Sequence, residues 1–350
     1  LVIVVAGSLA YLKYDWIISH RKELLLLIFT FCFTLLLLLV VLEVKLRMDY
    51  AKFHEEVRLK GESGTFCVVS SDDPELIYSL EPSACGYNSQ GFFDYEHTFQ
   101  KEDDIFRIIV IGDSVAYGWG VDTLNESFAR VLERNLNDGA VNKTYEVIVL
   151  AVPGYSSSQE LELLDTQAKK YDPDLIIWSY VLNDPAYSMF HDSDGQLGRY
   201  FSRYPLRLMH FFSEKWFFFQ EERKAQSCSV EDRYDYYKRL HCVYWSDVNQ
   251  TFIHLEEFSR EENVPIIFMI NPLFDPKGVE EYSYSSLHTK LADQATADGL
   301  LVVDLMDKYK NYDFDDLRLD IDFYDPWHPN AKGHRIIADY LSEIIEGHYE

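Results

Sequence analysis

The chain has 350 residues and a formal net charge of −26, with 47% hydrophobic and 26% charged residues. These fractions are typical of a folded globular protein and exclude disordered, collagen-like and low-complexity chains. The acidic balance argues against nucleic acid as a main partner, because phosphate binding requires a basic surface. We therefore expect no nucleic-acid partner. The length suits one large domain with an appendage, or two small domains.

The most apolar segment lies near the start of the chain. Residues 24–42 form a run of 19 residues without a charge, and at about 1.5 Å per residue a helix of this length nearly spans the ~30 Å core of a bilayer. Globular cores rarely hold helices that are apolar on all faces, and no small-residue signal cleavage site follows the run. We expect residues 1–42 to be a membrane anchor with a transmembrane helix at about 24–42. Residues 1–12 are also mostly apolar, so their membership of another span stays open.

Cysteine usage indicates the compartment better than the flanking charges, which are nearly balanced on the two sides of the run. Cys67, Cys85, Cys228 and Cys242 all lie beyond it. Two pairs at modest spacing suit disulfides in an oxidising compartment, and four unrelated buried thiols are the alternative. We predict bonds between the first two and between the last two cysteines. The soluble domain is accordingly expected outside the cytoplasm, on the periplasmic or cell-surface side.

An alternation of two patterns dominates the rest of the chain. Residues 43–105 predict a juxtamembrane helix followed by a loop-rich segment. Short apolar runs then alternate with segments of helical spacing; the runs are 106–111, 145–151, 174–181, 264–270 and 300–304, and the helical segments are 124–136, 159–171, 248–262, 287–297 and 330–346. This alternation predicts an α/β fold whose parallel sheet is covered by helices on both faces.

An aromatic-rich stretch at about 185–247 interrupts the alternation. It contains FFSEKWFFF at 211–219 and YDYY at 234–237. We expect a helical insertion with its own aromatic packing. A lid or acceptor-binding surface over the active site is an alternative, and so is an interfacial membrane contact, since aromatic side chains favour that zone.

Polar residues follow three of the predicted strands, at the sheet edge where α/β proteins place their chemistry. Ser114 comes directly after the first strand, where its hydroxyl and backbone N–H face the same space, as a nucleophile with its own oxyanion donor requires. Gly154 follows the second strand and lets a backbone N–H approach a substrate closely. Asn183 follows the third, and its amide can donate to an oxyanion. For the last two, a plain turn glycine and a helix cap or Asx turn are the structural alternatives.

Asp325 and His328 stand three residues apart just before the last helical segment. This spacing lets one turn present a carboxylate and an imidazole together. Asp325 can hold the tautomer of His328, and His328 can take the Ser114 proton. The aspartate-rich stretch 313–325 lacks the glycine of an EF-hand loop, so we expect a solvated acidic loop there and no metal.

Taken together, these motifs resemble those of the SGNH (GDSL-type) hydrolase family, over about residues 106–346. The matching residues are Gly112-Asp113-Ser114, Gly154, Asn183, and Asp325 with His328. Residues 85–91, CGYNSQG, also look like the segment that precedes the hydrolase domain in membrane-anchored bacterial members. The resemblance implies a flavodoxin-like three-layer α/β/α sandwich.

The resemblance also assigns roles to these residues. Ser114 would be the nucleophile, His328 the base and Asp325 the residue that orients it. The backbone N–H groups of Ser114 and Gly154 and the side chain of Asn183 would form the oxyanion hole, with Asp113 as a positioning residue. The chain departs from the family at Val181, where the third motif usually has glycine. A branched side chain there could narrow the pocket or shift Asn183.

The expected function is that of a membrane-anchored serine esterase that works through an acyl-Ser114 intermediate. O-acyl groups of a glycan, above all O-acetyl groups, are the expected substrate, with another small ester as the wider class. No metal or organic cofactor is implied. Two alternatives remain: an O-acyltransferase that uses the same triad to acylate an exported glycan, and a catalytically weak scaffolding or binding subunit beside membrane protein partners.

Overall fold

The computed structural model describes residues 16, 18–61, 67–73, 75–76, 78–138, 140, 143–185, 206–320 and 324–349. The chain divides into two compact units. The first, here called the helical unit, comprises Leu1–Ser63 and Phe201–Trp216, and the second, the sheet unit, comprises Gly64–Tyr200 and Phe217–Glu350. Helix α7 (Arg207–Ala225) begins in the first unit and ends in the second.

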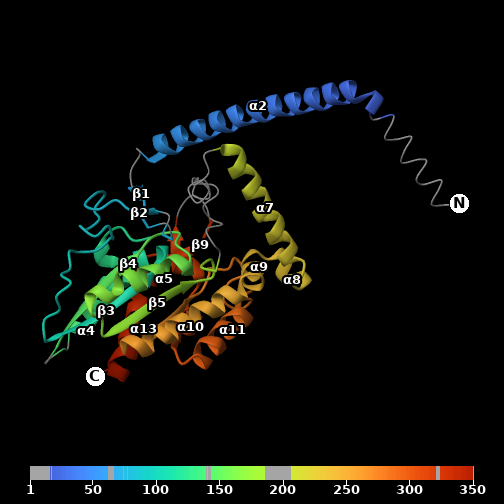
Figure 1. Cartoon of the computed structure of the whole chain (residues 1–350). Helices are drawn as coiled ribbons and strands as arrows, with labels where there is room; N and C mark the ends of the chain where they lie inside the picture. The colour runs from blue at the N-terminus through green and yellow to red at the C-terminus, as the bar shows by residue number, and fades with distance from the viewer. Residues whose placement is uncertain are drawn as a thin grey trace. The chain divides into compact units, whose positions relative to one another are not determined.

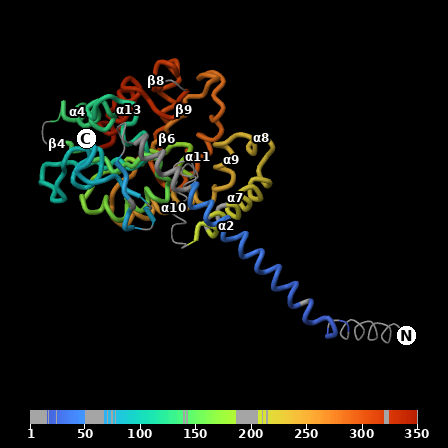
Figure 2. The backbone as a smooth tube through the Cα atoms, turned by 90° about the horizontal axis from the view of Figure 1, so that it is seen from above, coloured from blue at the N-terminus to red at the C-terminus, as the bar shows by residue number. Residues whose placement is uncertain are grey.

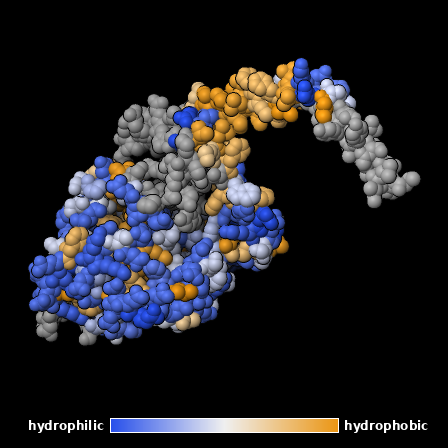
Figure 3. All heavy atoms as spheres, in the orientation of Figure 1, coloured by the Kyte–Doolittle hydropathy of each residue, from blue (hydrophilic) through white to orange (hydrophobic). Residues whose placement is uncertain are grey.

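A single long helix, α2 (Arg21–Gly61), makes up most of the described part of the helical unit; Figure 1 shows it in blue as one continuous helix, and Figure 2 shows its apolar first part in blue. Its segment Arg21–Asp49 is long and apolar enough to cross a membrane, and none of its most apolar window is buried. Figure 3 shows apolar side chains along much of this helix. The predicted span at 24–42 and the predicted juxtamembrane helix are therefore parts of one helix. Residues 1–12 lie outside the described residues.

The sheet unit is built on five parallel strands in the order β4-β3-β5-β6-β7. Their bounds are β3 (Ile105–Gly112), β4 (Thr144–Ala151), β5 (Leu175–Val181), β6 (Ile266–Asn271) and β7 (Leu301–Asp304). Each of the five corresponds to one of the predicted apolar runs. In chain order the sheet reads 2-1-3-4-5, which is the flavodoxin-like order. The predicted fold class is confirmed.

Helices cover both faces of this sheet, which is why β5 and β6 are buried along their whole length (Figure 1). Helix α4 (Phe128–Asn137) packs against α13 (Ala331–Tyr349), and α5 (Ser157–Thr166) packs against α10 (Trp245–Glu262). Helix α11 (Ser285–Ala297) contacts α10, β6 and β7. Fully buried parallel strands read as continuous apolar runs, as they do here.

The segment ahead of the sheet packs on the sheet unit through a small antiparallel pair, β1 (Val68–Ser70) and β2 (Tyr78–Leu80). Tyr78 and Leu80 are buried in the core, and a disulfide joins Cys67 to Cys85. The Tyr78 hydroxyl donates to the carbonyl of Pro153 at 2.7 Å, and its ring meets that of Tyr155 edge-on. This segment therefore supports the loop that follows β4.

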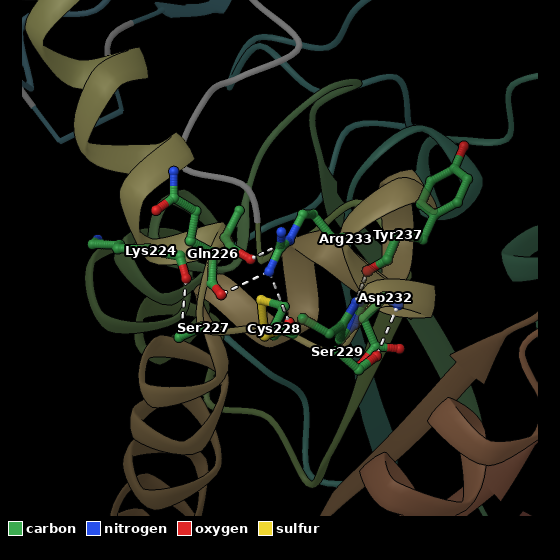
Figure 4. The surroundings of a disulfide bond; sticks show 11 residues. Lys224, Gln226, Ser227, Cys228, Ser229, Asp232, Arg233 and Tyr237 are labelled. Atoms are coloured by element: carbon green, nitrogen blue, oxygen red, sulfur yellow. Dashed lines mark hydrogen bonds between the residues drawn. A yellow bond between two sulfur atoms is a disulfide. The ribbon is translucent and has the colours of Figure 1, made fainter.

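The described part of the predicted insertion is helical and consists of α7, α8 (Val230–Tyr234) and α9 (Tyr236–Val243). The second disulfide, Cys228–Cys242, ties the loop after α7 to α9. Around it the Arg233 guanidinium donates to the carbonyls of Ala225, Gln226 and Cys228 (Figure 4). Both predicted disulfide pairings are present in the structure.

Candidate active site

Ser114 follows the carboxyl end of strand β3, which lies between β4 and β5 in the sheet, and it is the first residue of the short helix α3 (Ser114–Tyr117). The preceding Gly112 is required by close packing, because a Cβ there would lie 2.9 Å from the carbonyl oxygen of Ser179. Asp113 caps α3: its Oδ1 accepts from the backbone N–H of Val115 at 3.2 Å. The cap fixes the turn that presents the Ser114 hydroxyl, and the residue remains 9% exposed.

His328 stands within hydrogen-bonding distance of this hydroxyl. Its Nε2 lies 2.8 Å from Ser114 Oγ, and its Nδ1 lies 2.7 Å from Asp325 Oδ2. The structure thus brings Ser114 together with two residues that follow it by more than 200 positions in the chain. A neutral imidazole that donates from Nδ1 to a carboxylate has its Nε2 lone pair directed at the hydroxyl, which is the geometry of a general base.

The local backbone explains how Asp325 and His328 meet. The two residues lie in strand β9 (Tyr324–Pro329), which pairs antiparallel with β8 (Arg318–Asp320), and not in the simple turn that the sequence predicts. The Asp325 Oδ1 accepts from the backbone N–H groups of Trp327 and His328 at 2.9 and 3.0 Å, so the chain curls around one carboxylate oxygen while the other holds the imidazole.

The surroundings of Asp325 keep it ionised. Burial by itself would raise the pKa of its carboxyl, but the hydrogen bond and charge of His328 and the two backbone N–H donors outweigh burial and hold the pKa below its ordinary value. An ionised Asp325 stabilises the imidazolium that forms when His328 takes a proton.

The loop after β5 brings Asn183 to the same place. The Asn183 Nδ2 donates to Asp113 Oδ2 at 3.1 Å, and the same oxygen lies 3.3 Å from Ser114 Oγ. An amide nitrogen carries two hydrogens, so this bond orients the Asn183 side chain and leaves a second N–H to donate. The ligand site of a flavodoxin-like sheet lies at this switch point, between the first and third strands in chain order.

Gly154 occupies the neighbouring loop. Strand β4 ends at Ala151, in register with Gly112 of β3, and Gly154 follows with a φ of +78°, which favours glycine. The Tyr155 N–H donates to the carbonyl of Val152 at 3.1 Å, and the Tyr155 hydroxyl donates to the carbonyl of Tyr78. These bonds hold the Gly154 loop at the same edge of the sheet as Ser114.

Val181, which stands at the usual glycine position of the third motif, is fully buried as the last residue of β5 and pairs in register with Asn271. Its backbone N–H donates to Asp184 Oδ2 at 2.7 Å. The branched side chain is thus part of the core, and Asn183 still reaches Asp113.

Three buried carboxyl groups, those of Asp113, Glu160 and Asp184, lie in and near the loop that follows β5. The sequence predicts a role for Asp113 but not for the other two. Burial is the main cause that raises the pKa values of Asp113, Glu160 and Asp184, and the negative charge of its neighbours adds to the shift for Glu160 and Asp184. Glu160 is fully buried, and neither of its carboxyl oxygens has a hydrogen-bond partner within the described ranges. The only available signal was a glutamate on the apolar face of an amphipathic helix.

His334 is a further unpredicted residue. Burial lowers its pKa to about 4, so it is neutral. Its Nδ1 accepts from the backbone N–H of Phe128 at 3.3 Å, and its Nε2 donates to the carbonyl of Trp119 at 3.3 Å. This fixes Trp119, whose ring lies 5.7 Å from that of His328 between centroids, while the Trp327 ring lies 6.1 Å from it. Two indole rings therefore lie close to the imidazole.

Within the part of the chain that the structure describes, no group of three or more His, Cys, Asp or Glu side chains is arranged to hold a metal ion. The arrangement around Ser114 combines a hydroxyl, an imidazole, a carboxylate that is hydrogen-bonded to the imidazole, and an amide donor. Such a combination can perform acyl transfer through a serine ester.

Several solved structures are similar to this chain. An acetyl xylan esterase is 12% identical (68% of this chain, 99% of that chain, TM-score 0.42). The esterase EstA from Pseudoalteromonas sp. is 15% identical (69% and 97%, TM-score 0.41), as is a lipase/acylhydrolase from Enterococcus faecalis (69% and 95%, TM-score 0.42). No curated protein sequence matches the chain.

The sequence profile of one family matches more than half of the chain. It is that of the GDSL-like lipase/acylhydrolase family, and the match covers residues 110–336, which include Ser114, Gly154, Asn183, Asp325 and His328. The chain therefore belongs to the GDSL-like lipase/acylhydrolase family, and it is a serine ester hydrolase of the SGNH type.

Proposed function

We propose that Ser114 is the nucleophile of this enzyme, with His328 as general base and Asp325 as the residue that orients it. The observation that carries this proposal is the hydrogen-bonded chain from Ser114 Oγ through His328 to Asp325, with links of 2.8 and 2.7 Å. A nucleophile, a base and a third group that orients the base are the parts that an acyl-enzyme mechanism needs.

In the first half-reaction His328 accepts the Ser114 proton while Oγ attacks the ester carbonyl. Negative charge develops on the carbonyl oxygen, and the backbone N–H groups of Ser114 and Gly154 with the Asn183 amide stabilise it. The C–O bond to the alcohol then breaks, and His328 gives its proton to the leaving oxygen. The product is an acyl-Ser114 ester and a free alcohol.

In the second half-reaction His328 takes a proton from water, which attacks the acyl carbonyl. Collapse of this second tetrahedral intermediate breaks the bond to Ser114 Oγ, returns the proton to the serine and releases the acid. Asp113 acts as a positioning residue, because it accepts from the Asn183 amide and from the backbone N–H of Val115 in the turn that carries Ser114. No step requires a metal or an organic cofactor.

The substrate in this proposal is an O-acylated glycan, with O-acetyl groups foremost. Its basis is the resemblance of residues 85–91 to membrane-anchored family members that are associated with exported glycans. The indole rings of Trp119 and Trp327 beside His328 agree with it, since aromatic rings offer flat apolar faces next to the reacting group.

We place the enzyme on a membrane with its sheet unit outside the cytoplasm. The apolar segment Arg21–Asp49 supports the anchor, and the two disulfides support an oxidising compartment. Protease treatment of intact and of lysed cells checks the side of the membrane. A sheet unit that is digested only after the cytoplasm has been opened to the protease contradicts this location.

Fluorophosphonate labelling of the detergent-solubilised full chain tests the proposed roles. Ser114→Ala and His328→Ala are expected to abolish labelling and to reduce ester turnover about 10³-fold or more. Ser158→Ala and His254→Ala, which change more exposed residues of the same types, serve as controls and keep both signals. Labelling that persists in Ser114→Ala contradicts the proposal.

The same protein decides between water and a sugar as the acyl acceptor. With an acyl donor and a glycan present together, release of free acid alone supports hydrolysis, whereas acylated glycan supports an O-acyltransferase. A folded wild-type chain that neither labels nor turns over esters, yet co-purifies with membrane proteins, supports the scaffolding role instead.

A further inference from the structure

Helix α7 exposes apolar side chains along one face. Met209, Phe212 and Trp216 are 42%, 55% and 62% exposed, and Phe219 one turn further is 52% exposed. Successive steps of three, four and three residues place these four side chains on one stripe of a helix. Ala225, which helical spacing places on the side of α7 opposite this stripe, is buried. A helix of a globular domain points its apolar stripe inward, so an outward apolar stripe indicates a surface that contacts something else.

The start of α7 is attached to α2 at a defined point. The two carboxylate oxygens of Glu43 accept from the backbone N–H groups of Arg207 and Leu208 at 3.1 and 2.8 Å. Both helix segments belong to the helical unit. The Arg47 Nε donates to the same carboxylate at 2.6 Å, which holds the Glu43 side chain in place.

Glu43 is the first charged residue after the uncharged run 24–42. If that run crosses the bilayer core, Glu43 stands where the hydrocarbon ends and the headgroups begin. The hydrogen bonds from Arg207 and Leu208 therefore place the first turn of α7 at the membrane surface. Met209 and Phe212 follow within the next turn, on the same helix segment of the same unit.

We infer that the stripe formed by Met209, Phe212 and Trp216 of α7 binds the surface of the lipid bilayer that α2 crosses. The inference rests on the proposed membrane anchor and extends it to a second point of attachment. Tryptophan and phenylalanine partition into the interfacial zone, where an amphipathic helix lies in the membrane plane with its apolar face in the acyl boundary.

The chemistry of the surface follows from charge. A net charge of −26 opposes adsorption to an anionic leaflet, so the occupant of this stripe is a zwitterionic phospholipid surface that is bound through apolar and aromatic contact. Lys215 lies next to Trp216 on the same helix, with its ammonium 5.6 Å from the centroid of the Phe211 ring, so its stem covers apolar surface.

Quenching of tryptophan fluorescence by lipids brominated on the acyl chain tests the inference. The full chain is reconstituted in phosphatidylcholine vesicles with and without bromine, as wild type, Trp216→Phe and Trp245→Phe. Trp245 is the matched control, because it lies in α10 of the sheet unit with the Lys290 ammonium 3.4 Å above its ring. We expect Trp216→Phe to lose a large part of the quenchable emission and Trp245→Phe to lose none of it.

A second pair of variants keeps Trp216 as the reporter. Phe212→Ser removes one apolar side chain of the stripe and is expected to reduce the quenching of Trp216. Tyr234→Ser removes an 83% exposed aromatic residue of α8 outside the stripe and is expected to leave the quenching unchanged. Equal quenching in wild type and Trp216→Phe overturns the inference, and so does a response to Tyr234→Ser equal to that to Phe212→Ser.

Flotation of the vesicles distinguishes a failure of the membrane anchor from a failure of the α7 contact. A chain that floats with vesicles but shows no quenching at Trp216 retains its anchor and loses the α7 contact. A chain that does not float contradicts the anchor and the α7 contact together. Fluorophosphonate labelling at Ser114 is independent of all these outcomes.

Discussion

The backbone N–H of Val181 donates to the Asp184 carboxylate at 2.7 Å, and the Asp184 N–H donates back to the Val181 carbonyl at 3.0 Å. This reciprocal pair closes the turn that carries Asn183. The turn is therefore built by the backbone of residue 181 and is independent of its side chain. A valine in place of the usual glycine is compatible with the site because its side chain lies in the core.

Replacing Val181 by glycine is expected to lower the free energy of unfolding without improving catalysis. Loss of a fully buried valine costs about 1.5–3 kcal/mol, and glycine within a strand adds roughly 0.5–1 kcal/mol. Denaturant unfolding and ester turnover of the full chain in detergent check both points. A variant of unchanged stability with faster turnover would show that the valine restricts the pocket.

Asp325→Asn is expected to leave the fold intact and reduce kcat/KM about 10³- to 10⁴-fold. An amide in place of the carboxylate no longer stabilises the imidazolium and no longer selects the Nδ1–H tautomer of His328. Asp307→Asn, at an exposed aspartate of α12 (Met306–Tyr309), is the control and should retain activity. Loss of less than about tenfold would mean that His328 is oriented without Asp325.

Glu160→Gln is expected to stabilise the protein at neutral pH. Burial raises the folded-state pKa of Glu160 well above its ordinary value, so stability that is present below the unfolded pKa is lost as pH rises toward the folded pKa. Glutamine cannot ionise and removes this loss. Unfolding free energies of wild type and variant across the acidic to neutral range check the sign, with the exposed Glu257→Gln as control. A variant with the same pH slope as wild type would show that Glu160 does not titrate differently on folding.

The raised pKa of His97 predicts that the protein loses stability at alkaline pH. Burial lowers its pKa, but the carboxylates of Asp94 and Glu146 raise it more, to about 9. A raised histidine pKa contributes stability below the unfolded value of 6.5 and loses it as pH rises through about 9; the shift corresponds to about 3 kcal/mol. His97→Gln should be less stable than wild type at pH 6 and approach it near pH 10. Parallel pH curves for the two proteins would rule out this linkage.

The sheet was predictable from sequence because its strands are buried on both faces. The run 264–270 is apolar throughout, and Arg107 is the one charged residue in the run 106–111, so both can be recognised without knowing which helices pack on them. Ser114, Asn183 and His328 were also predictable as candidates, since each follows a strand or precedes a helix. The disulfide pairs followed from their number and spacing.

Other features depend on contacts that sequence patterns do not carry. Strand β9 holds two prolines and no alternation of apolar residues, so nothing in it predicts pairing with β8. Glu160 stands in the first turn of its helix, where a carboxylate normally faces solvent, yet the fold buries it. Tyr78 reaches Pro153 across 75 positions of sequence.

The contact between Tyr78 and the Gly154 loop defines how short this enzyme can be made. A chain trimmed to start at β3 would keep every proposed catalytic side chain, but it would leave the Pro153 carbonyl without its hydroxyl donor and uncover Tyr155. The segment that begins at Cys67 is therefore a structural part of the sheet unit. The Cys67–Cys85 disulfide stabilises this segment, although both cysteines lie outside the five-stranded sheet. The shortest fragment that we expect to fold by itself therefore begins at about residue 67, some forty residues before the first parallel strand.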